Sequence, residues 1–198
     1  MWIVKLGGSL CTDPLLPQWL DLVAQLGGGR IAVVAGGGGF ADEARRLQAH
    51  WQFDDLAAHN MAVLAMAQTA YQMHALNPAL QLAARESDIR RVLHSSHTAL
   101  WLPFELQRDE PDAITNWLHT SDSIALDLAR KLNAERLVVV KSCSIDPALS
   151  VTELSRAGIL DQRFAALSEG VEFPINVLNK DDLTGMRALL FDEGRYPR

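Results

Sequence analysis

Along this chain, short runs of apolar residues alternate with longer segments in which apolar residues recur every three or four positions. The runs at 2–5, 31–35 and 137–140 are typical of buried strands, and the spacing at 17–26 is typical of a helix with one buried face, which ends at three glycines. Strands that alternate with helices in this way predict an α/β fold with a parallel sheet.

The same reasoning predicts the remaining elements. Strands are expected at 91–93, 99–102 and 174–178. Helices are expected at 41–51, 151–157 and 161–167, and at 56–76 after a cap at Asp54 or Asp55. Two further helices are expected from Thr120 or Ser121 to 132 and from Asp181 or Asp182 to 190. The helix at 56–76 is rich in alanine and methionine, which is typical of a helix in the core or at a subunit interface. We therefore expect a homodimer or a higher homo-oligomer; the alternative is that this helix packs on the chain's own sheet.

Two glycine-rich segments follow two of the predicted strands. Gly7 and Gly8 come after the strand at 2–5, and four consecutive glycines, 36–39, come after the strand at 31–35. Because glycine has no Cβ, a phosphate can approach its backbone N–H closely, and helix N-termini at the same edge add partial positive charge. Lys5 would add a full positive charge. Neither segment has the spacing of a Walker A loop or of a dinucleotide-binding fingerprint. The pattern therefore predicts a phosphate-binding edge suited to phosphoryl transfer; the alternative is two plain tight turns.

Composition and charge narrow the classes of function. The 198 residues are 48% hydrophobic and 21% charged, with a net charge of −6, as in one ordinary globular domain. An acidic chain is unsuited to a broad nucleic-acid-binding face, so an anionic ligand needs a local positive cluster. Two distant cysteines, no signal-like start and no apolar run of about 18 residues predict a cytoplasmic protein without a membrane segment. The spacing of the histidines predicts no metal site.

Four segments of the sequence resemble the amino acid kinase superfamily, which includes the aspartate, glutamate and uridylate kinases. They are Val-Lys-Leu-Gly-Gly-Ser-Leu at 4–10, the second glycine segment with its flanks at 33–42, Thr-Ser-Asp-Ser-Ile-Ala at 120–125, and Leu-Val-Val-Val at 137–140. Gly-Gly-Phe-Ala-Asp at 38–42 and the segment from Trp117 to Asp122 are similar to the small branch that contains the methanofuran-pathway kinase. That kinase phosphorylates a phosphorylated aminomethylfuran.

This resemblance implies a three-layer αβα sandwich with a mostly parallel central sheet, as a single domain over 1–198. The N-terminal part would bind the acceptor and the C-terminal part would bind ATP. Lys5 would neutralise the transferring phosphoryl group, and Asp122 would orient lysine side chains rather than take a proton. The alternative for Lys5 is an ordinary surface lysine at the end of a strand. The alternative for Asp122 is a carboxylate that only complements a helix dipole. Mg²⁺ is expected with ATP, held chiefly by phosphates and water.

Further residues are expected to contact the ligands. Phosphate-binding residues would be Gly7, Gly8, Ser9, Gly36, Gly37 and Gly38; acceptor-binding residues Gly39, Asp42, His59 and Ser121; nucleotide-binding residues Lys141, Ser142 and Lys180. Asp42 either binds an amine or hydroxyl of the acceptor or simply starts a helix. His59 either pairs with a phosphate ester or is structural, and Ser9 either donates to a phosphate or caps its turn.

Two departures from the superfamily pattern bear on activity. The strand at 137–140 runs into Lys141 and Ser142 instead of a Thr-Asp-like pair, and nothing after Gly158 matches the Gly-Gly-Met-x-x-Lys-like segment that carries a second catalytic lysine. Lys141 either contacts phosphate or blocks the usual ribose contacts, and the acidic neighbours of Lys180 predict a solvated helix start. The leading hypothesis is an ATP-dependent small-molecule kinase, acting on a phosphorylated furan or on a carboxylate. The alternative is a nucleotide- or anion-binding regulatory protein that keeps the fold without the chemistry.

Overall fold

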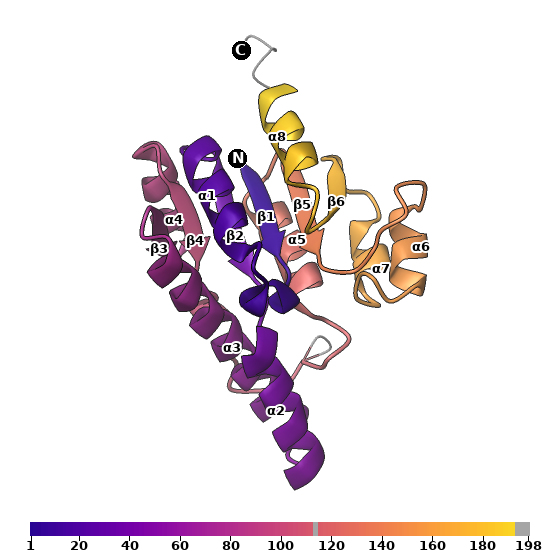
Figure 1. Ribbon diagram of the computed structural model, residues 1–198. Helices are drawn as coiled ribbons and strands as arrows, with labels where there is room; N and C mark the ends of the chain where they lie inside the picture. Colours follow the sequence, from indigo (N-terminus) through magenta and orange to yellow (C-terminus); the bar gives the residue numbers. More distant parts are fainter. Residues whose placement is uncertain (113–114, 193–198) are drawn as a thin grey trace.

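The apolar runs pair into one parallel sheet in the computed structural model, which describes residues 1–112 and 115–192 (Figure 1). Its strands are β1 (Trp2–Leu6), β2 (Ile31–Ala35), β3 (Leu80–Ala83), β4 (Thr98–Trp101), β5 (Arg136–Lys141) and β6 (Ile175–Asn179), in the order β3-β4-β2-β1-β5-β6. All five neighbouring pairs are parallel. β1 therefore lies between β2 and β5, and the segments that leave these three strands start at one edge of the sheet.

Helices cover both faces of this sheet, which confirms the predicted αβα sandwich. The helical segments are η1 (Gly8–Thr12), α1 (Leu16–Leu26), α2 (Gly38–Trp51), α3 (Asp55–Leu76), α4 (Glu86–His94), η2 (Phe104–Leu106), α5 (Ser121–Lys131), α6 (Val151–Arg156), α7 (Phe164–Ser168) and α8 (Leu183–Asp192). One core cluster joins one face of β1 and β2 to α1, α3 and α8, and a second joins the opposite face to α4, α5, α6 and α7. α2 and the adjoining part of α3 extend past the carboxyl edge of the sheet, below it in Figure 1.

The predicted strand at 91–93 is wrong, because these residues belong to α4. Its buried residues Ile89, Val92 and Leu93 have helical spacing, and the Asp88 carboxylate accepts a hydrogen bond from the Arg85 N–H at 3.2 Å, which supports the first turn. β3 was not predicted; it has four residues and follows α3 almost directly. The other predicted elements are confirmed within a few residues, and the predicted domain extends to 198, of which 193–198 lie outside the described residues.

The long alanine- and methionine-rich helix α3 packs on the chain's own sheet. Asp54 caps it by accepting from the Ala57 N–H at 2.9 Å, and the cluster on that face of the sheet includes Ala67, Ala70 and Met73. The apolar face of α3 is thus partly buried within the chain itself. A homo-oligomer stays a prediction. None of the described helices combines the length and the hydropathy that crossing a membrane requires.

Candidate active site

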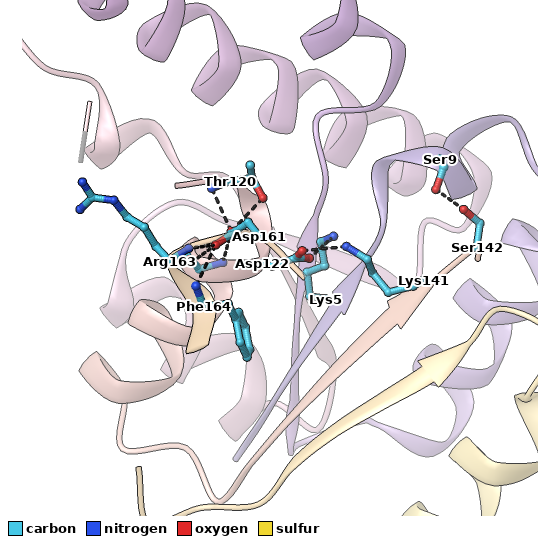
Figure 2. Close-up of polar contacts among 10 residues, drawn as sticks. Lys5, Ser9, Thr120, Asp122, Lys141, Ser142, Asp161, Arg163 and Phe164 are labelled. Carbon is cyan, nitrogen blue, oxygen red and sulfur yellow. Dashed lines mark hydrogen bonds and ion pairs between the residues drawn. The ribbon is translucent and has the colours of Figure 1, made fainter. Parts of the chain in front are cut away.

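Two lysines and one aspartate meet at the carboxyl edge of the sheet (Figure 2). Lys5 lies in β1 opposite Val139 of β5, so Lys141 lies two residues further along β5, on the same face. Asp122, in the first turn of α5, spans this offset. Lys5 Nζ is 2.7 Å from Asp122 Oδ1, and Lys141 Nζ is 2.7 Å from Asp122 Oδ2. One carboxylate thus bridges two ammonium groups, and the lysine–aspartate cluster (Lys5, Asp122 and Lys141) carries a net positive charge.

This cluster is almost closed to solvent. The side chains of Lys5 and Asp122 are 4% and 3% exposed, and that of Lys141 is 19% exposed. Burial raises the pKa of Asp122, but the two ammonium groups outweigh it and hold that pKa below its ordinary value. Burial lowers the pKa of Lys5; attraction by Asp122 opposes this shift, and repulsion by Lys141 adds to it. Each oxygen of the ionised Asp122 carboxylate therefore faces one ammonium group, an arrangement that fits the expected role of orienting lysines.

The two glycine segments touch backbone to backbone beside the cluster. A Cβ at Gly8 would lie 2.4 Å from the backbone nitrogen of Gly38, and a Cβ at Gly36 would lie 2.4 Å from the backbone nitrogen of Gly8. Gly38 also has a φ of +54°, which side chains rarely adopt. Glycine is thus needed here because the two loops approach each other, a reason separate from any ligand.

Two of the glycine amides expected to bind phosphate are engaged elsewhere. The Gly7 N–H donates to the Val140 carbonyl at 3.1 Å, and the Gly36 N–H donates to the Leu6 carbonyl at 2.9 Å. These bonds extend the pairing of β1 with β5 and with β2, so the structure does not support phosphate contacts by these two N–H groups. Gly37 is the N-cap of α2, and Gly38 and Gly39 are its first two residues; no side chain caps this helix start, which carries a partial positive charge.

A cavity of about 460 Å³ adjoins the cluster and brings most of the predicted site together. The predicted residues in its wall are Lys5, Gly8, Ser9, Gly37, Gly38, Gly39, Asp42, His59, Ser121, Asp122 and Lys141. Gly7, Gly36, Ser142 and Lys180 are not part of this wall. The cavity has the size and the mixed polarity of a small-molecule site.

Ser142 and Lys180, both expected to bind nucleotide, instead tie loops together. The Ser142 hydroxyl contacts that of Ser9, which joins the end of β5 to the first glycine segment (Figure 2). The Lys180 ammonium pairs with the Asp13 carboxylate, and that hydrogen bond raises the pKa of Lys180. The side chain of Lys180 is 26% exposed, and Asp181 and Asp182 between it and α8 are exposed, so the helix start is solvated as expected.

Charged and aromatic side chains lie at the mouth of the cavity, and one of them, Arg45, was not singled out from the sequence. Arg45 Nη1 is 3.1 Å from Asp42 Oδ1, and its guanidinium lies 4.3 Å from the ring centre of Trp117. The Trp117 indole N–H donates to Gln48 Oε1 at 2.6 Å, which fixes the ring. Arg45 was not singled out because its partner Trp117 lies far away in the sequence.

His59 is half-buried in the same wall. Its Nε2 is 2.9 Å from the Leu106 carbonyl oxygen. Burial lowers the pKa of His59, the hydrogen bond to Leu106 opposes this, and the positive charge of Arg108 lowers the pKa further. His59 is therefore biased towards the neutral ring.

Asp161 is the main functional candidate that the sequence did not reveal. Its carboxylate accepts from the Thr120 N–H at 3.0 Å and hydroxyl at 2.9 Å, and from the Ser123 N–H at 3.0 Å and hydroxyl at 2.5 Å. It also accepts from the N–H groups of Arg163 at 3.2 Å and Phe164 at 3.0 Å (Figure 2). Asp161 thus caps α5 and α7 together and fixes the turn that bears Asp122. The sequence shows Asp161 at the start of the helix that follows it, but it does not show that the same carboxylate also binds the start of α5.

Comparison with known proteins gives a consistent result. The model of the amino acid kinase family matches residues 1–144. Over 195 residues the chain is 25% identical to the (5-(aminomethyl)furan-3-yl)methyl phosphate kinase of Methanocaldococcus jannaschii, a match that covers 96% of this chain and 79% of that protein.

Solved structures share the fold at low sequence identity. The uridylate kinase from Archaeoglobus fulgidus has a TM-score of 0.70 and 14% identity, with 94% of this chain and 95% of that chain covered. The isopentenyl phosphate kinase from T. acidophilum has a TM-score of 0.61 and 12% identity, with 96% and 95% covered. The region matched by the family model contains Lys5, Asp122 and Lys141.

Proposed function

The chain belongs to the amino acid kinase family, and from this premise we propose that it is an ATP-dependent kinase that transfers the γ-phosphoryl group to a small-molecule acceptor. The observation that carries the proposal is the buried lysine–aspartate cluster beside the 460 Å³ cavity. Phosphoryl transfer needs positioned positive charge more than covalent chemistry from the protein. Two ammonium groups held by one carboxylate supply such charge.

In the proposed reaction, an oxygen of the acceptor bonds to the γ-phosphorus while the bond to the β–γ bridging oxygen breaks, and ADP leaves. Lys5 and Lys141 contact the equatorial oxygens of the transferring group, and the first turn of α2 offers N–H groups to phosphate. Asp122 takes no proton, because both of its oxygens face ammonium groups. A phosphate acceptor needs no base near neutral pH, since its second pKa is about 6.

Lys141 takes the place of the second lysine that no segment after Gly158 supplies. Its ammonium contacts the same carboxylate as Lys5, from the neighbouring strand. The role of Lys141 is therefore charge neutralisation during transfer, and it needs no helix-borne lysine from the C-terminal third of the chain. This position of Lys141 supports catalysis over the alternative of a regulatory protein without chemistry.

We propose a phosphorylated aminomethylfuran as the acceptor, by similarity to the kinase of M. jannaschii. The cavity offers positive Arg45 for a phosphate, and negative Asp42 and Asp55 for an amine. The N-terminal part of this single domain would bind the acceptor, and the C-terminal part, from the end of β5 onward, would bind ATP. A carboxylate acceptor, which would give an acylphosphate, is the alternative within the family.

Mg²⁺ enters this proposal with ATP. Within residues 1–112 and 115–192, no three His, Cys, Asp or Glu side chains gather into a group that could hold a metal ion. The proposed steps therefore assign no protein ligand to Mg²⁺. A cytoplasmic location and a homo-oligomer complete the proposal.

The test is ADP release by the purified chain with ATP and Mg²⁺, across a panel of phosphorylated and carboxylated acceptors. Lys5→Ala and Lys141→Ala are each expected to lower kcat by about 10²–10³-fold, the usual cost of removing one positioned charge or donor. The matched control is Lys131→Ala, which removes a 60%-exposed lysine 3.8 Å from Glu105. Full activity in Lys5→Ala contradicts the proposal, and tight ATP binding without turnover of any acceptor supports the regulatory alternative.

A further inference from the structure

We propose that Arg45 binds the phosphate group of the acceptor, and that Trp117 and Gln48 are positioning residues that hold its guanidinium ready at the cavity. This inference rests on the proposed kinase function and specifies how the same cavity selects a phosphorylated acceptor. It gives a role to an arginine that sequence reasoning did not single out and to the tryptophan that contacts it.

The side chain of Arg45 is accessible from the cavity. It belongs to the wall of the 460 Å³ cavity, which the lysine–aspartate cluster also lines, and it is 47% exposed. An arginine stays charged in proteins, so this positive charge does not depend on its surroundings. A ligand in the cavity can therefore reach a group that is always positive.

The guanidinium of Arg45 donates a single hydrogen bond within residues 1–112 and 115–192, from Nη1 to Asp42 Oδ1 at 3.1 Å. A guanidinium has five N–H donors in one plane, so a phosphate can bind through two of them at once. The Asp42 side chain is 73% exposed, and an ion pair between such exposed groups is weak. A phosphate can therefore bind Arg45 beside Asp42 or in its place.

Trp117 holds the guanidinium by its face and leaves its edge open. The central carbon of the guanidinium, Cζ, lies 4.3 Å from the centre of the Trp117 ring, which is a cation–π contact. The N–H groups of a guanidinium lie in its plane, so a contact with its face does not block them. The contact also orders a long side chain before the ligand binds, which lowers the entropic cost of binding.

Gln48 fixes the Trp117 ring in turn. Its Oε1 accepts from the indole N–H at 2.6 Å, and its Nε2 donates to Asp55 Oδ1 at 2.8 Å and to the Phe53 carbonyl at 3.4 Å. An indole N–H only donates and a carboxylate only accepts, so these partners define the orientation of the amide. Gln48 follows Arg45 by three residues in α2, so both side chains lie on the face that meets Trp117.

The guanidinium lies towards the end of α2 that adjoins the lysine–aspartate cluster. Side chains of a helix lean towards its N-terminus, and the contact of Arg45 with Asp42, three residues earlier, shows this direction. The helix begins at Gly38, whose backbone touches that of Gly8. In the proposed complex, two oxygens of the acceptor phosphate bind Arg45, and a third bonds to the γ-phosphorus as ADP leaves.

The test measures binding without ATP by calorimetry, with three probes that differ in one group. They are (5-(aminomethyl)furan-3-yl)methyl phosphate, the alcohol that lacks its phosphate, and the analogue with a carboxylate in place of the phosphate. The wild-type chain is expected to bind the phosphate probe at least about tenfold more tightly than either of the others, the usual effect of a hydrogen bond to a charged group. A phosphate probe that binds no more tightly than the other two overturns the inference.

Arg45→Met and Arg46→Met form a matched pair of variants. Both residues are exposed arginines of α2 with an acidic partner three residues earlier, but Arg46 is not part of the cavity wall. Arg45→Met is expected to abolish the preference for phosphate, Arg45→Lys to retain part of it, and Arg46→Met to leave it unchanged; a thermal melt checks that each variant folds. An equal preference in the two methionine variants contradicts the inference.

The two positioning residues are tested through Arg45. Trp117→Leu removes the ring, and Gln48→Glu sets a carboxylate against that of Asp55. Each is expected to lower the preference for phosphate about two- to tenfold, the cost of immobilising one long side chain, and to have no such effect in the Arg45→Met variant. An equal loss of affinity for all three probes, with or without Arg45, would mean a purely structural role and contradicts the assignment of these residues.

Failure of the kinase proposal and failure of this inference give different results. The binding measurements use no ATP, so a preference for phosphate without ADP release contradicts the kinase proposal and supports the inference. ADP release with the same KM for the acceptor in Arg45→Met as in the wild-type chain contradicts the inference alone.

Discussion

At the scale of single residues, the lysine–aspartate cluster sets the charge of the site before a ligand binds. Two ammonium groups share one buried carboxylate, so one positive charge is left over in a place that water hardly reaches. Charge in such surroundings acts more strongly on a ligand than charge at a surface. The cluster can therefore attract an anionic group although the chain as a whole carries a net charge of −6.

The lowered pKa of Lys5 predicts the alkaline limit of activity. The proposed mechanism needs the charged ammonium of Lys5. Burial favours the neutral amine, so the proton leaves at a lower pH than the roughly 10.4 of an ordinary lysine. kcat/KM is expected to fall as the pH rises through this lowered pKa. Lys5→Arg, whose guanidinium stays charged, should lose that limb while retaining some activity. A pH profile of kcat/KM checks this prediction. If kcat/KM of Lys5→Arg falls at the same alkaline pH as that of the wild-type chain, the fall belongs to the titration of another group.

Sequence reasoning expected a carboxylate beside Lys5, and it named Asp122 for that place. Lys5 and Asp122 belong to quoted motifs, and the structure brings them into contact. Lys141 was singled out but given to the nucleotide, because its distance from Asp122 depends on the register of β1 with β5. Asp161 was not singled out as a candidate because Thr120, which it binds, lies at the start of another helix.

At the scale of elements, the site is held by contacts between the ends of helices and strands. Asp161 fixes the start of α5 from the start of α7, and the two glycine segments lock β1 and β2 to each other at their carboxyl ends. The residues proposed as catalytic thus lie on strands and on the first turn of a helix, which are more rigid supports than free loops.

Asp161→Asn is expected to lower both stability and turnover. The amide cannot accept all six hydrogen bonds that the carboxylate accepts, so buried N–H or O–H groups of α5 and α7 lose a partner. We expect a loss of about 1–3 kcal/mol in the free energy of unfolding, measured in urea, together with a fall in kcat as Asp122 shifts. The control is Asp146→Asn, since Asp146 Oδ1 accepts from the nearby Ala148 N–H in an exposed loop. Equal losses of stability and of kcat in the two variants would contradict the role of Asp161 in holding the starts of α5 and α7.

A pair of glycine substitutions tests the contact between the loops. Gly36→Ala puts a Cβ 2.4 Å from the Gly8 nitrogen and should cost about 1–3 kcal/mol by overpacking. At Gly39 a Cβ meets nothing within 4 Å, so Gly39→Ala should be neutral or slightly stabilising. Urea midpoints of both variants measure the difference. Equal stability of the two would mean that the loops are not packed as described.

Element prediction failed where elements are short. α4 was read as a strand at 91–93 because a three-residue window does not separate a period of two from one of 3.6. The four residues of β3 follow the Asn77 cap of α3 too closely to stand out as a separate apolar run. The long helix α3 and the buried strands β1, β2 and β5, by contrast, were clear from their pattern alone.

At the scale of the whole molecule, the αβα sandwich followed from the alternation of strands and helices together with the family resemblance. The strand order is not readable from the pattern, yet it places β1 between β2 and β5 and thereby creates the site. Which helices cover which face depends on the side chains that alternate along each strand, and both faces are apolar here. For this reason the sequence pattern predicts that helices cover both faces of the sheet, but not which helix lies on which face.

Nucleotide binding should stabilise the whole domain. A ligand at about 100 times its Kd adds about 2.7 kcal/mol to the free energy of unfolding. For a chain of this size that corresponds to a rise in Tm of about 5–10 °C. Scanning calorimetry with and without ATP and Mg²⁺ measures the shift, which should be smaller in Lys5→Ala. An unchanged Tm at millimolar ATP would contradict nucleotide use by this chain.

The sheet fixes the spacing of Lys5 and Lys141, whereas α2, α3 and the segment before α5 form the rest of the cavity wall. In the proposed kinase, the residues that transfer the phosphoryl group and the surface that selects a substrate thus lie on separate parts of the fold. Such a division lets the specificity of an enzyme drift, in nature or by directed evolution, while its reactive core is inherited intact. Residues at the cavity mouth, such as Arg45 and Trp117, are the natural first targets for giving this scaffold a new substrate.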